Sequence, residues 1–261
     1  MAHSSLIVIP ARLDSTRLKH KIMQDINGAP MLAHVIRHAQ KAQIADVIVA
    51  CDHHDTAQLC QTCHVNAIMT DSSLPSGSDR IAQALTLFDK EKTYQWIINV
   101  QGDMPSLTTQ ALSALNAMRP KKTETPTKEH MSIATLVAPI HDTEECHNPH
   151  VVKAIVSWDH QQEQRALPRG RAHYFTRRPV MSSDGIVYHH IGLYAYSRET
   201  LEAFQKMPPS PLESIEKLEQ LRAIEADIPI YVSCLKEALR GIDTQEDLDA
   251  MRQQETQHAM P

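Results

Sequence analysis

The chain has 261 residues, of which 42% are hydrophobic and 22% charged, a composition typical of a folded protein with a buried core. The net charge of −5 argues against general binding to nucleic acid or to an anionic membrane, so an anionic substrate needs a local basic pocket. The first residues lack a signal-peptide pattern, and no apolar run reaches the roughly 18 residues of a membrane-spanning helix, so we expect a soluble, cytoplasmic protein. The five cysteines, an odd number at irregular spacing, predict reduced thiols.

In the first half of the chain, short apolar runs alternate with longer amphipathic stretches. The runs predicted to form buried strands are residues 6–9, 47–49, 67–69 and 96–100. The predicted helices are residues 30–41, a segment that Asp55 could cap, and a segment after Gly77. Strands that are apolar throughout and are separated by helices indicate a parallel sheet covered on both faces.

The second half is expected to be more antiparallel. A polar, proline-bearing segment at 120–129 predicts a surface loop and not a domain linker, because a strand-like run at 132–137 follows it. The other strand-like runs are 151–152, 154–156, 191–196 and 228–232, and further helices are predicted at 212–226 and 245–252. We therefore expect one α/β domain over residues 1–261, with a mostly parallel mixed sheet and an antiparallel substrate subregion at about 150–200.

A cation-rich loop follows the first predicted strand. Its charged and hydroxyl side chains are Arg12, Ser15, Thr16, Arg17, Lys19 and Lys21. Ligands of an open parallel sheet bind beyond the carboxyl ends of the strands, and this density of donors could neutralise a triphosphate. The alternative is a basic, solvated surface loop, because the segment has neither a Walker-type motif nor a GxGxxG motif.

Two carboxylates are candidates for a magnesium site. Asp103 lies three residues after the end of the predicted strand at 96–100, beside Gly102, which permits close approach of a ligand. Mg²⁺ prefers one or two carboxylates completed by phosphate oxygens and water, and Asp243 could be the second carboxylate. The alternative for Asp243 is a helix N-cap, because it precedes a Thr-x-Glu-Asp sequence that is typical of a helix start.

The segment Pro75–Arg80 precedes a predicted helix. Gly77 and Ser78 could present backbone amides near the helix N-terminus, and Arg80 could add a charged donor. An ordinary capped helix accounts for the same residues.

Cys60–His64 matches the C-x-x-C-H pattern of covalent haem attachment, and His53 and His54 lie close enough to suggest zinc. Haem attachment requires export, and no export signal is present. We predict a helix end with two partly buried thiols instead.

Several motifs resemble the 3-deoxy-manno-octulosonate (KDO) cytidylyltransferases. The opening PAR-x-x-STRL-x-x-K, which ends at Lys21, is similar to that family, and so is the Ile-Asn-Gly-x-Pro-Met segment at 26–31. Gln-Gly-Asp103 and Gly-Ile-Asp243-Thr-x-Glu-Asp-Leu recur there too, although they are about 140 residues apart.

Further segments extend the resemblance over nearly the whole chain. They are Ser76–Arg80, Asn148–Lys153, Tyr174–Arg177, His189–Tyr194 and Pro209–Arg222. The chain departs from the family at Lys19-His20, where the family has Pro-Gly, and at His189, where it has Arg.

The resemblance implies a three-layer fold of the nucleotide-diphospho-sugar transferase type. It implies transfer of CMP from CTP to the anomeric hydroxyl of KDO, with release of pyrophosphate, for lipopolysaccharide synthesis. It further implies Mg²⁺ as the cofactor, held by Asp103 and Asp243, and a homodimer whose contacts involve the subregion at about 150–200.

The resemblance also implies roles for single residues. Asp103, Lys21 and Arg12 would be catalytic. The CTP-binding residues would be Arg12, Ser15, Lys21, Gly77, Ser78 and Arg80. The residues that hold the sugar acid would be Gln101, Arg177, His190, Tyr194, Glu219 and Gln220. From the residues alone, His190 and Tyr194 could be satisfied strand positions, and Glu219 and Gln220 the polar side of an amphipathic helix.

Alternatives to KDO itself stay open. The same reaction could act on 8-amino-KDO or on a sialic-type nonulosonate. The chain could also be a non-catalytic nucleotide-binding paralogue, although the retention of both acids, Arg12 and Lys21 argues against that.

Overall fold

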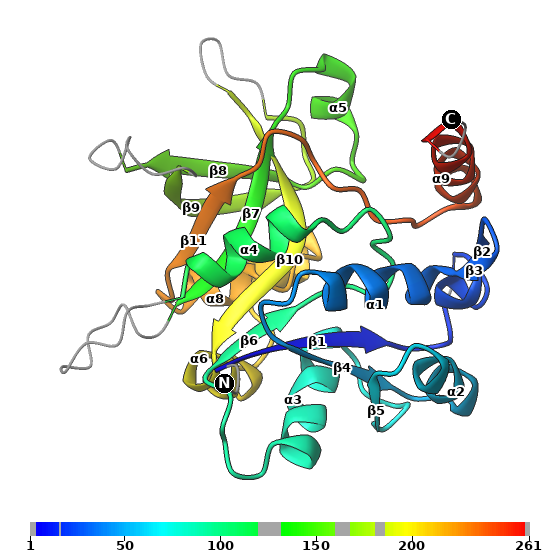
Figure 1. Cartoon of the computed structure of the whole chain (residues 1–261). Helices are drawn as coiled ribbons and strands as arrows, with labels where there is room; N and C mark the ends of the chain where they lie inside the picture. Colours follow the sequence, from blue (N-terminus) through cyan, green and yellow to red (C-terminus); the bar gives the residue numbers. More distant parts are fainter. Residues whose placement is uncertain (1–3, 16, 120–131, 160–167, 181–185, 259–261) are drawn as a thin grey trace. The chain divides into compact units, whose positions relative to one another are not determined.

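The structure is a computed structural model that describes residues 4–15, 17–119, 132–159, 168–180 and 186–258 (Figure 1). Thr16 and the predicted loop at 120–129 lie outside the described residues. The chain divides into two compact units: a first unit of Met1–Tyr94, Asn99–Leu112 and Leu239–Pro261, and a second unit of Gln95–Ile98 and Ser113–Ala238. The single domain over 1–261 stays a prediction. Within the described ranges, none of the helices combines the length and apolar character that a membrane crossing requires.

Three parallel strands in the order β5-β4-β1 form the sheet of the first unit. They are β1 (Ser5–Ala11), β4 (Asp46–Cys51) and β5 (Asn66–Met69). Ile7 pairs with Val47, and Ile48 pairs with Asn66. These strands coincide with the apolar runs in the sequence, and β1 is almost entirely buried, as expected of a strand covered on both faces.

Helices cover this sheet. The remaining elements of the unit are the 3₁₀ turn η1 (Lys21–Met23), the hairpin of β2 (Asp25–Ile26) and β3 (Ala29–Pro30), α1 (Met31–Lys41), α2 (His54–Thr62), α3 (Gly77–Phe88) and α9 (Gln245–His258). Figure 1 shows α1 and α3 on opposite sides of β1 and β4. The helices predicted at 30–41, after Gly77 and at 245–252 are therefore confirmed.

The start of α2 corrects one expectation and its end confirms another. His53, in an extended conformation, is the N-cap, because its ring Nδ1 accepts the backbone N–H of Asp55 at 3.2 Å. The prediction that Asp55 caps this helix was wrong. Cys60 is buried in the last turn and Cys63 follows the helix, so the predicted helix end in this segment is confirmed.

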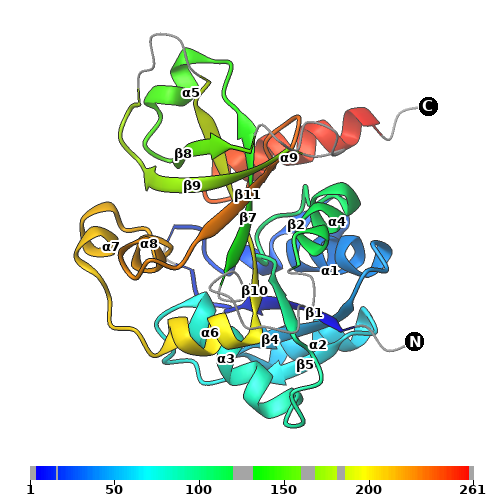
Figure 2. The same ribbon diagram turned by 90° about the vertical axis from the view of Figure 1, so that its left-hand side faces the viewer.

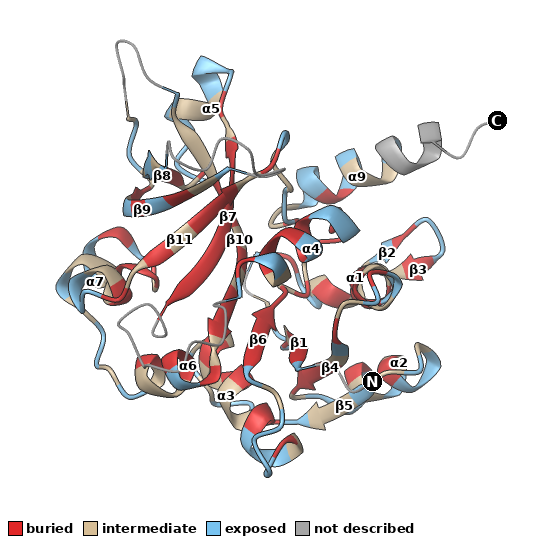
Figure 3. Ribbon diagram, turned by 60° about the vertical axis from the view of Figure 1, so that its left-hand side comes forward, coloured by how far each residue is buried: buried red, intermediate tan, exposed pale blue. Residues whose placement is uncertain are grey.

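The second unit contains strands in the order β6-β10-β7-β11-β9-β8. Their bounds are β6 (Trp96–Asn99, through Ile98 in this unit), β7 (Ile133–Pro139), β8 (Lys153–Trp158), β9 (Arg169–Thr176), β10 (Tyr188–Ser197) and β11 (Ile230–Cys234). β11 runs parallel to β7, whereas β10–β7, β11–β9 and β8–β9 are antiparallel. The expected antiparallel region within 150–200 is confirmed. Figure 3 shows that β7, β10 and β11 are largely buried.

The helices of the second unit are short. They are the end of α4 (Thr109–Ala117), which begins in the first unit, α5 (Thr143–His147), α6 (Arg198–Gln205), α7 (Pro211–Glu216) and α8 (Leu221–Glu225). Figure 2 shows α7 and α8 as two separate helices, so the single helix predicted at 212–226 was wrong.

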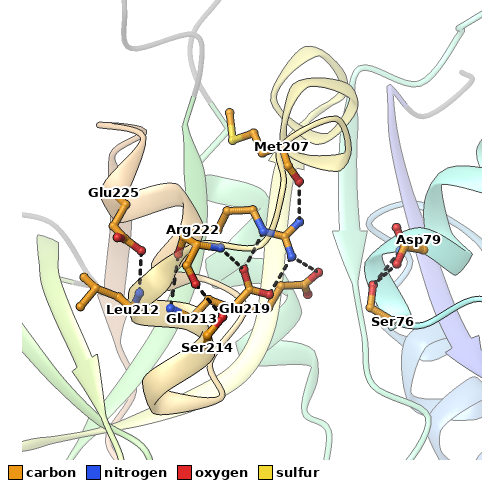
Figure 4. A network of polar contacts seen from close by, with 10 residues as sticks. Ser76, Asp79, Met207, Leu212, Glu213, Ser214, Glu219, Arg222 and Glu225 are labelled. Atoms are coloured by element: carbon orange, nitrogen blue, oxygen red, sulfur yellow. Dashed lines mark hydrogen bonds and ion pairs between the residues drawn. The ribbon is translucent and has the colours of Figure 1, made fainter.

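Two interactions account for this break. Lys217 adopts a left-handed conformation with φ of 56°, which ends α7. Arg222 then donates from Nε and Nη2 to the two carboxylate oxygens of Glu213, at 2.8 and 2.7 Å (Figure 4). In one continuous helix, the nine-residue separation would place these residues about 13 Å apart along the axis. The bidentate ion pair therefore favours two short helices.

Candidate active site

A cavity of about 320 Å³ lies in the first unit, at the carboxyl end of β1. The predicted site residues that line it are Arg12, Ser15, Lys21, Gly77, Arg80, Gln101, Asp103 and Asp243. Residues far apart in the sequence thus meet where an open parallel sheet is expected to bind its ligand. Ser78 is buried in the first turn of α3 and is absent from the lining.

Lys21 joins the two predicted metal carboxylates. Its Nζ donates to Oδ2 of Asp103 at 2.5 Å and to Oδ1 of Asp243 at 2.9 Å. Burial lowers the pKa of Lys21, but the two carboxylates outweigh burial and the net pKa is raised, so the ammonium stays charged. Arg17 adds a second cation, with Nη1 3.2 Å from Oδ2 of Asp243.

Backbone contacts bring the two carboxylates together. The N–H of Ile242 donates to the carbonyl of Asp103 at 2.9 Å, which fixes the segment before α9 against the loop after β6. A Cβ at Gly102 would lie 3.1 Å from the carbonyl oxygen of Pro10, so a larger residue would push this loop away from β1.

The helix-cap alternative for Asp243 is not what the structure contains. The hydroxyl of Thr244 accepts the N–H of Asp247 at 3.2 Å, and Oδ2 of Asp247 accepts the N–H of Thr244 at 2.9 Å. This reciprocal pair caps α9. The Asp243 carboxylate is thereby left to Lys21 and Arg17.

Arg80, a predicted CTP-binding residue, also has protein partners in this structure. It touches the cavity lining, yet its side chain is only 2% exposed and its Nη2 lies 3.1 Å from Oδ2 of Asp52. Its Nη1 donates to the hydroxyl of Thr70 at 2.6 Å. Oδ1 of Asp52 accepts the N–H of Leu13 at 3.0 Å. The buried ion pair therefore supports the loop that carries Arg12 and Ser15.

Sequence reasoning missed Asp52. A signal existed, because Asp52 directly follows the buried parallel strand β4, at the carboxyl end where ligands of such sheets bind. For the segment Pro75–Arg80, the predicted alternative of an ordinary capped helix is confirmed. The Ser76 hydroxyl accepts the N–H of Asp79 at 3.1 Å and donates to its carboxylate at 2.7 Å (Figure 4).

The second unit holds a cluster of the predicted sugar-binding residues. The rings of His190 and Tyr194 lie 5.3 Å apart, and the ring of Phe175 lies 4.8 Å from His190. Burial, with smaller effects from His189 and Arg177, lowers the pKa of His190 to about 3. Burial, followed by Tyr196 and Glu219, raises the pKa of Tyr194 well above its usual value. Both side chains are therefore neutral near pH 7.

A bulge in β10 shapes this cluster. His190 pairs with Val137 and Ile191 with Leu136, but the next pair is Tyr194 with Thr135. The hydroxyl of Thr135 lies 2.7 Å from the carbonyl of Leu193 and 3.0 Å from Nε2 of His190. Thr135 thus ties the bulge to the histidine.

Gln220 and Glu219 lie between α7 and α8, and Arg177 follows β9. Gln220 is only 7% exposed, and its buried Nε2 has no hydrogen-bond partner within the described part of the chain. An unpaired buried donor is costly, so Gln220 is suited to bind a ligand acceptor. Gln101, the remaining predicted sugar residue, belongs to the first unit, and its Nε2 donates to Oδ1 of Asn99 at 3.2 Å.

Comparison with known proteins decides the family. The model of the family described as cytidylyltransferase matches residues 6–233. The chain belongs to the cytidylyltransferase family. Among curated relatives, the 3-deoxy-manno-octulosonate cytidylyltransferase of Bartonella quintana is 45% identical over 252 residues, covering 97% of this chain and 98% of the relative. The corresponding protein of Rhodospirillum rubrum is 43% identical, covering 96% and 95%.

Solved structures agree with this membership. A CMP:2-keto-3-deoxy-manno-octonic acid synthetase complexed with CTP is 31% identical, with a TM-score of 0.84, and covers 97% of this chain and 99% of that one. A 4-diphosphocytidyl-2C-methyl-D-erythritol synthase of Anaerococcus prevotii, 11% identical with a TM-score of 0.63 over 97% and 98% of the two chains, shares the fold alone. The predicted α/β fold class, the family resemblance and the assignment as a nucleotidyltransferase are confirmed.

Proposed function

We propose that this cytidylyltransferase transfers CMP from CTP to the anomeric hydroxyl of KDO and releases pyrophosphate. The observation that carries the proposal is the cavity in which Lys21, Asp103 and Asp243 converge. The proposal is also supported by relatives that are named 3-deoxy-manno-octulosonate cytidylyltransferase and that align with this chain over nearly their whole length. The sugar hydroxyl attacks the α-phosphorus, the bond from that phosphorus to the bridging oxygen breaks, and pyrophosphate leaves.

Asp103 and Asp243 are proposed to hold Mg²⁺. The fit rests on geometry: carboxylate oxygens of both residues already approach one cationic atom, Nζ of Lys21, within 2.9 Å. Among the described residues, no group of three or more His, Cys, Asp and Glu side chains could hold a metal, so phosphate oxygens and water would complete the shell. When bound, the ion would offset the charge on the phosphate oxygens and help ionise the attacking hydroxyl.

The cations of the first unit are proposed to bind the triphosphate. Arg12 lies exposed at the cavity, where its guanidinium can pair with phosphate oxygens, and Ser15 adds a hydroxyl. Lys21 keeps its charge and can stabilise the negative charge that develops on the leaving pyrophosphate. Gly77 adds a backbone amide at the start of α3.

The second unit is proposed to bind the sugar acid. Arg177 would pair with the carboxylate. The Thr135 hydroxyl has one proton and lies nearest the Leu193 carbonyl, an acceptor only, so it donates there and accepts from Nε2–H of His190. Neutral His190 is then left with an unprotonated Nδ1, which suits a sugar hydroxyl and not a carboxylate. Tyr194, Glu219 and Gln220 supply further polar contacts.

Pyrophosphate release from CTP and Mg²⁺ tests the proposal, with KDO, 8-amino-KDO, a sialic-type nonulosonate or no sugar added. We expect release with KDO. Release only with another acid would keep the reaction and replace the substrate. CTP binding without release under any condition would favour the non-catalytic paralogue and overturn the proposal.

The finer biological setting is also part of the proposal. On the family resemblance, we further propose that the product serves lipopolysaccharide synthesis and that the enzyme is a cytoplasmic homodimer. Sedimentation of the purified chain tests the dimer, and a single species at the monomer mass of 29.4 kDa would exclude it.

A further inference from the structure

The backbone of Arg177 is held from both sides by charged side chains. Its N–H donates to Oε2 of Glu216 at 3.2 Å, and its carbonyl accepts from Nζ of Lys153 at 2.7 Å. Its own Nη1 donates to the carbonyl of Pro149 at 3.2 Å. The peptide on each side of Arg177 therefore has a fixed direction, although the residue lies beyond the end of β9.

Lys153 is an unusual lysine because its side chain is completely buried. Its ammonium uses all three donors on backbone carbonyls: Asn148 at 3.0 Å, Val151 at 2.8 Å and Arg177 at 2.7 Å. Burying an ammonium is costly, and an apolar residue would fill the same volume without that cost. What the ammonium adds is a fixed distance between the loop before β8 and the carbonyl of Arg177.

Glu216 acts from the other side. It is 9% exposed at the end of α7, and its carboxylate accepts from three groups at the end of β9. These are the Tyr174 hydroxyl at 3.4 Å, the Thr176 hydroxyl at 3.0 Å and the Arg177 N–H at 3.2 Å. Lys153 and Glu216 thus approach the same residue from two elements, β8 and α7.

We propose that Lys153 and Glu216 are positioning residues that orient Arg177 toward the carboxylate of the sugar acid. Neither residue is assigned a contact with substrate, and both act through the Arg177 backbone. The inference rests on the proposed function, in which Arg177 pairs with that carboxylate. A guanidinium and a carboxylate form two parallel hydrogen bonds only in a narrow range of orientations, so a small shift of the Arg177 backbone weakens binding strongly.

A double-mutant cycle on the full-length enzyme tests this proposal. The variants are Lys153→Met, Arg177→Met and both together, and pyrophosphate release gives KM for KDO and for CTP. We expect Lys153→Met to raise KM for KDO roughly 10–100-fold and to leave KM for CTP within about twofold. In the Arg177→Met background, Lys153→Met should add less than about threefold, because the group that it positions is gone.

Two more measurements cover a Lys153 variant that fails to fold. Glu216→Gln keeps an acceptor oxygen and should retain KM for KDO better than Glu216→Ala, which removes it. Leu201→Ala, a buried core change on α6, should lower the thermal midpoint without changing KM for KDO. Equal KM values for the two Glu216 variants, or a raised KM in Leu201→Ala, would mean a general stability effect and overturn the proposal.

Failure of the positioning role can be distinguished from failure of the proposed role of Arg177 in sugar binding. If Arg177→Met leaves KM for KDO unchanged, the sugar role of Arg177 is wrong and the positioning role falls with it. If Arg177→Met raises KM but Lys153→Met does not, or if the two effects multiply, only the positioning role is overturned.

Discussion

The two units present contrasting polar chemistry. In the first unit, the ammonium of Lys21 pairs with the carboxylates of Asp103 and Asp243 at a solvent-reached cavity, with the Asp243 side chain 47% exposed. In the second unit, His190 is buried and Tyr194 half-buried, and both are neutral. Phosphates carry charge that must be offset, whereas hydroxyls of a sugar are selected by direction and shape. The contrast teaches that substitutions at the cavity of the first unit should act mainly through charge, and those at His190 and Tyr194 mainly through geometry.

The strongest test of the cavity in the first unit is Asp103→Asn, which keeps the shape of the side chain and removes its carboxylate. We expect kcat to fall by about 100–1000-fold, because a catalytic metal contributes several kcal/mol to the transition state. Initial rates of pyrophosphate release at saturating CTP measure it. Asp14→Asn, an exposed acid at the same cavity, is the matched control and should stay within about threefold. Near-full activity of Asp103→Asn would refute the metal assignment.

Lys21→Met separates a specific cation from the general basicity of the loop. Loss of a charge-assisted contact of about 1.5–3 kcal/mol should raise KM for CTP roughly 10–100-fold. Lys19→Met removes an equal charge from an exposed position two residues away and should change KM less than about threefold. A larger effect at Lys19 than at Lys21 would show that the wrong lysine has been assigned to the phosphates.

The buried His190 of the second unit predicts a pH effect on stability. The folded pKa of His190 is about 3, well below an unfolded value near 6.5, so between these limits the unfolded chain binds a proton that the native chain does not. The free energy of unfolding should therefore be fully maintained above about pH 6.5 and decline as pH falls, by at most about 1.4 kcal/mol per unit from this residue.

Urea unfolding of the wild type and of His190→Gln, at pH 7 and pH 5.5, measures that slope. The variant should lose less stability on acidification than the wild type. His173→Gln, at an exposed position on β9, should keep the wild-type slope. Identical slopes for wild type and His190→Gln would mean that folding does not lower the pKa of His190.

The smallest effect is expected from an exposed ion pair beside the cavity of the first unit. The Arg17–Asp243 ion pair is exposed, with side-chain exposures of 57% and 47%. Removing it by Arg17→Ala should lower the free energy of unfolding by no more than about 1 kcal/mol, because solvent screens such pairs. Thermal unfolding at low and high salt checks this. A loss well above that figure would mean that Arg17 supports the fold of the loop.

The sequence predicted the parallel strands well because their apolar runs are continuous and are separated by amphipathic helices. It also predicted the approach of Asp103 to Asp243, through the rule for strand ends together with the family motifs. It failed where a distant contact overrides a local pattern. The apolar periodicity at 212–226 cannot reveal that Arg222 pairs with Glu213 and that Lys217 adopts a left-handed conformation.

The ion pair of Arg80 could not be predicted for a related reason. Its partner Asp52 lies 28 positions earlier in the chain, after β4. Periodicity carries no information on such pairs. The hydrogen bonds from Lys153 and Glu216 to the Arg177 backbone could not be predicted for the same reason, because the three residues come from separate parts of the chain.

The bulge in β10 makes the number of residues between His190 and Tyr194, and not only their identity, decide how the two side chains lie. Four positions along a regular strand span about 13 Å, but His190 and Tyr194 advance only two positions along β7, or about 7 Å. Their rings can therefore meet at 5.3 Å. Deleting Gly192 alone would turn Tyr194 to the opposite face, whereas deleting both Gly192 and Leu193 would keep its facing. A related chain with the same His and Tyr but one residue fewer between them would hold a different pocket.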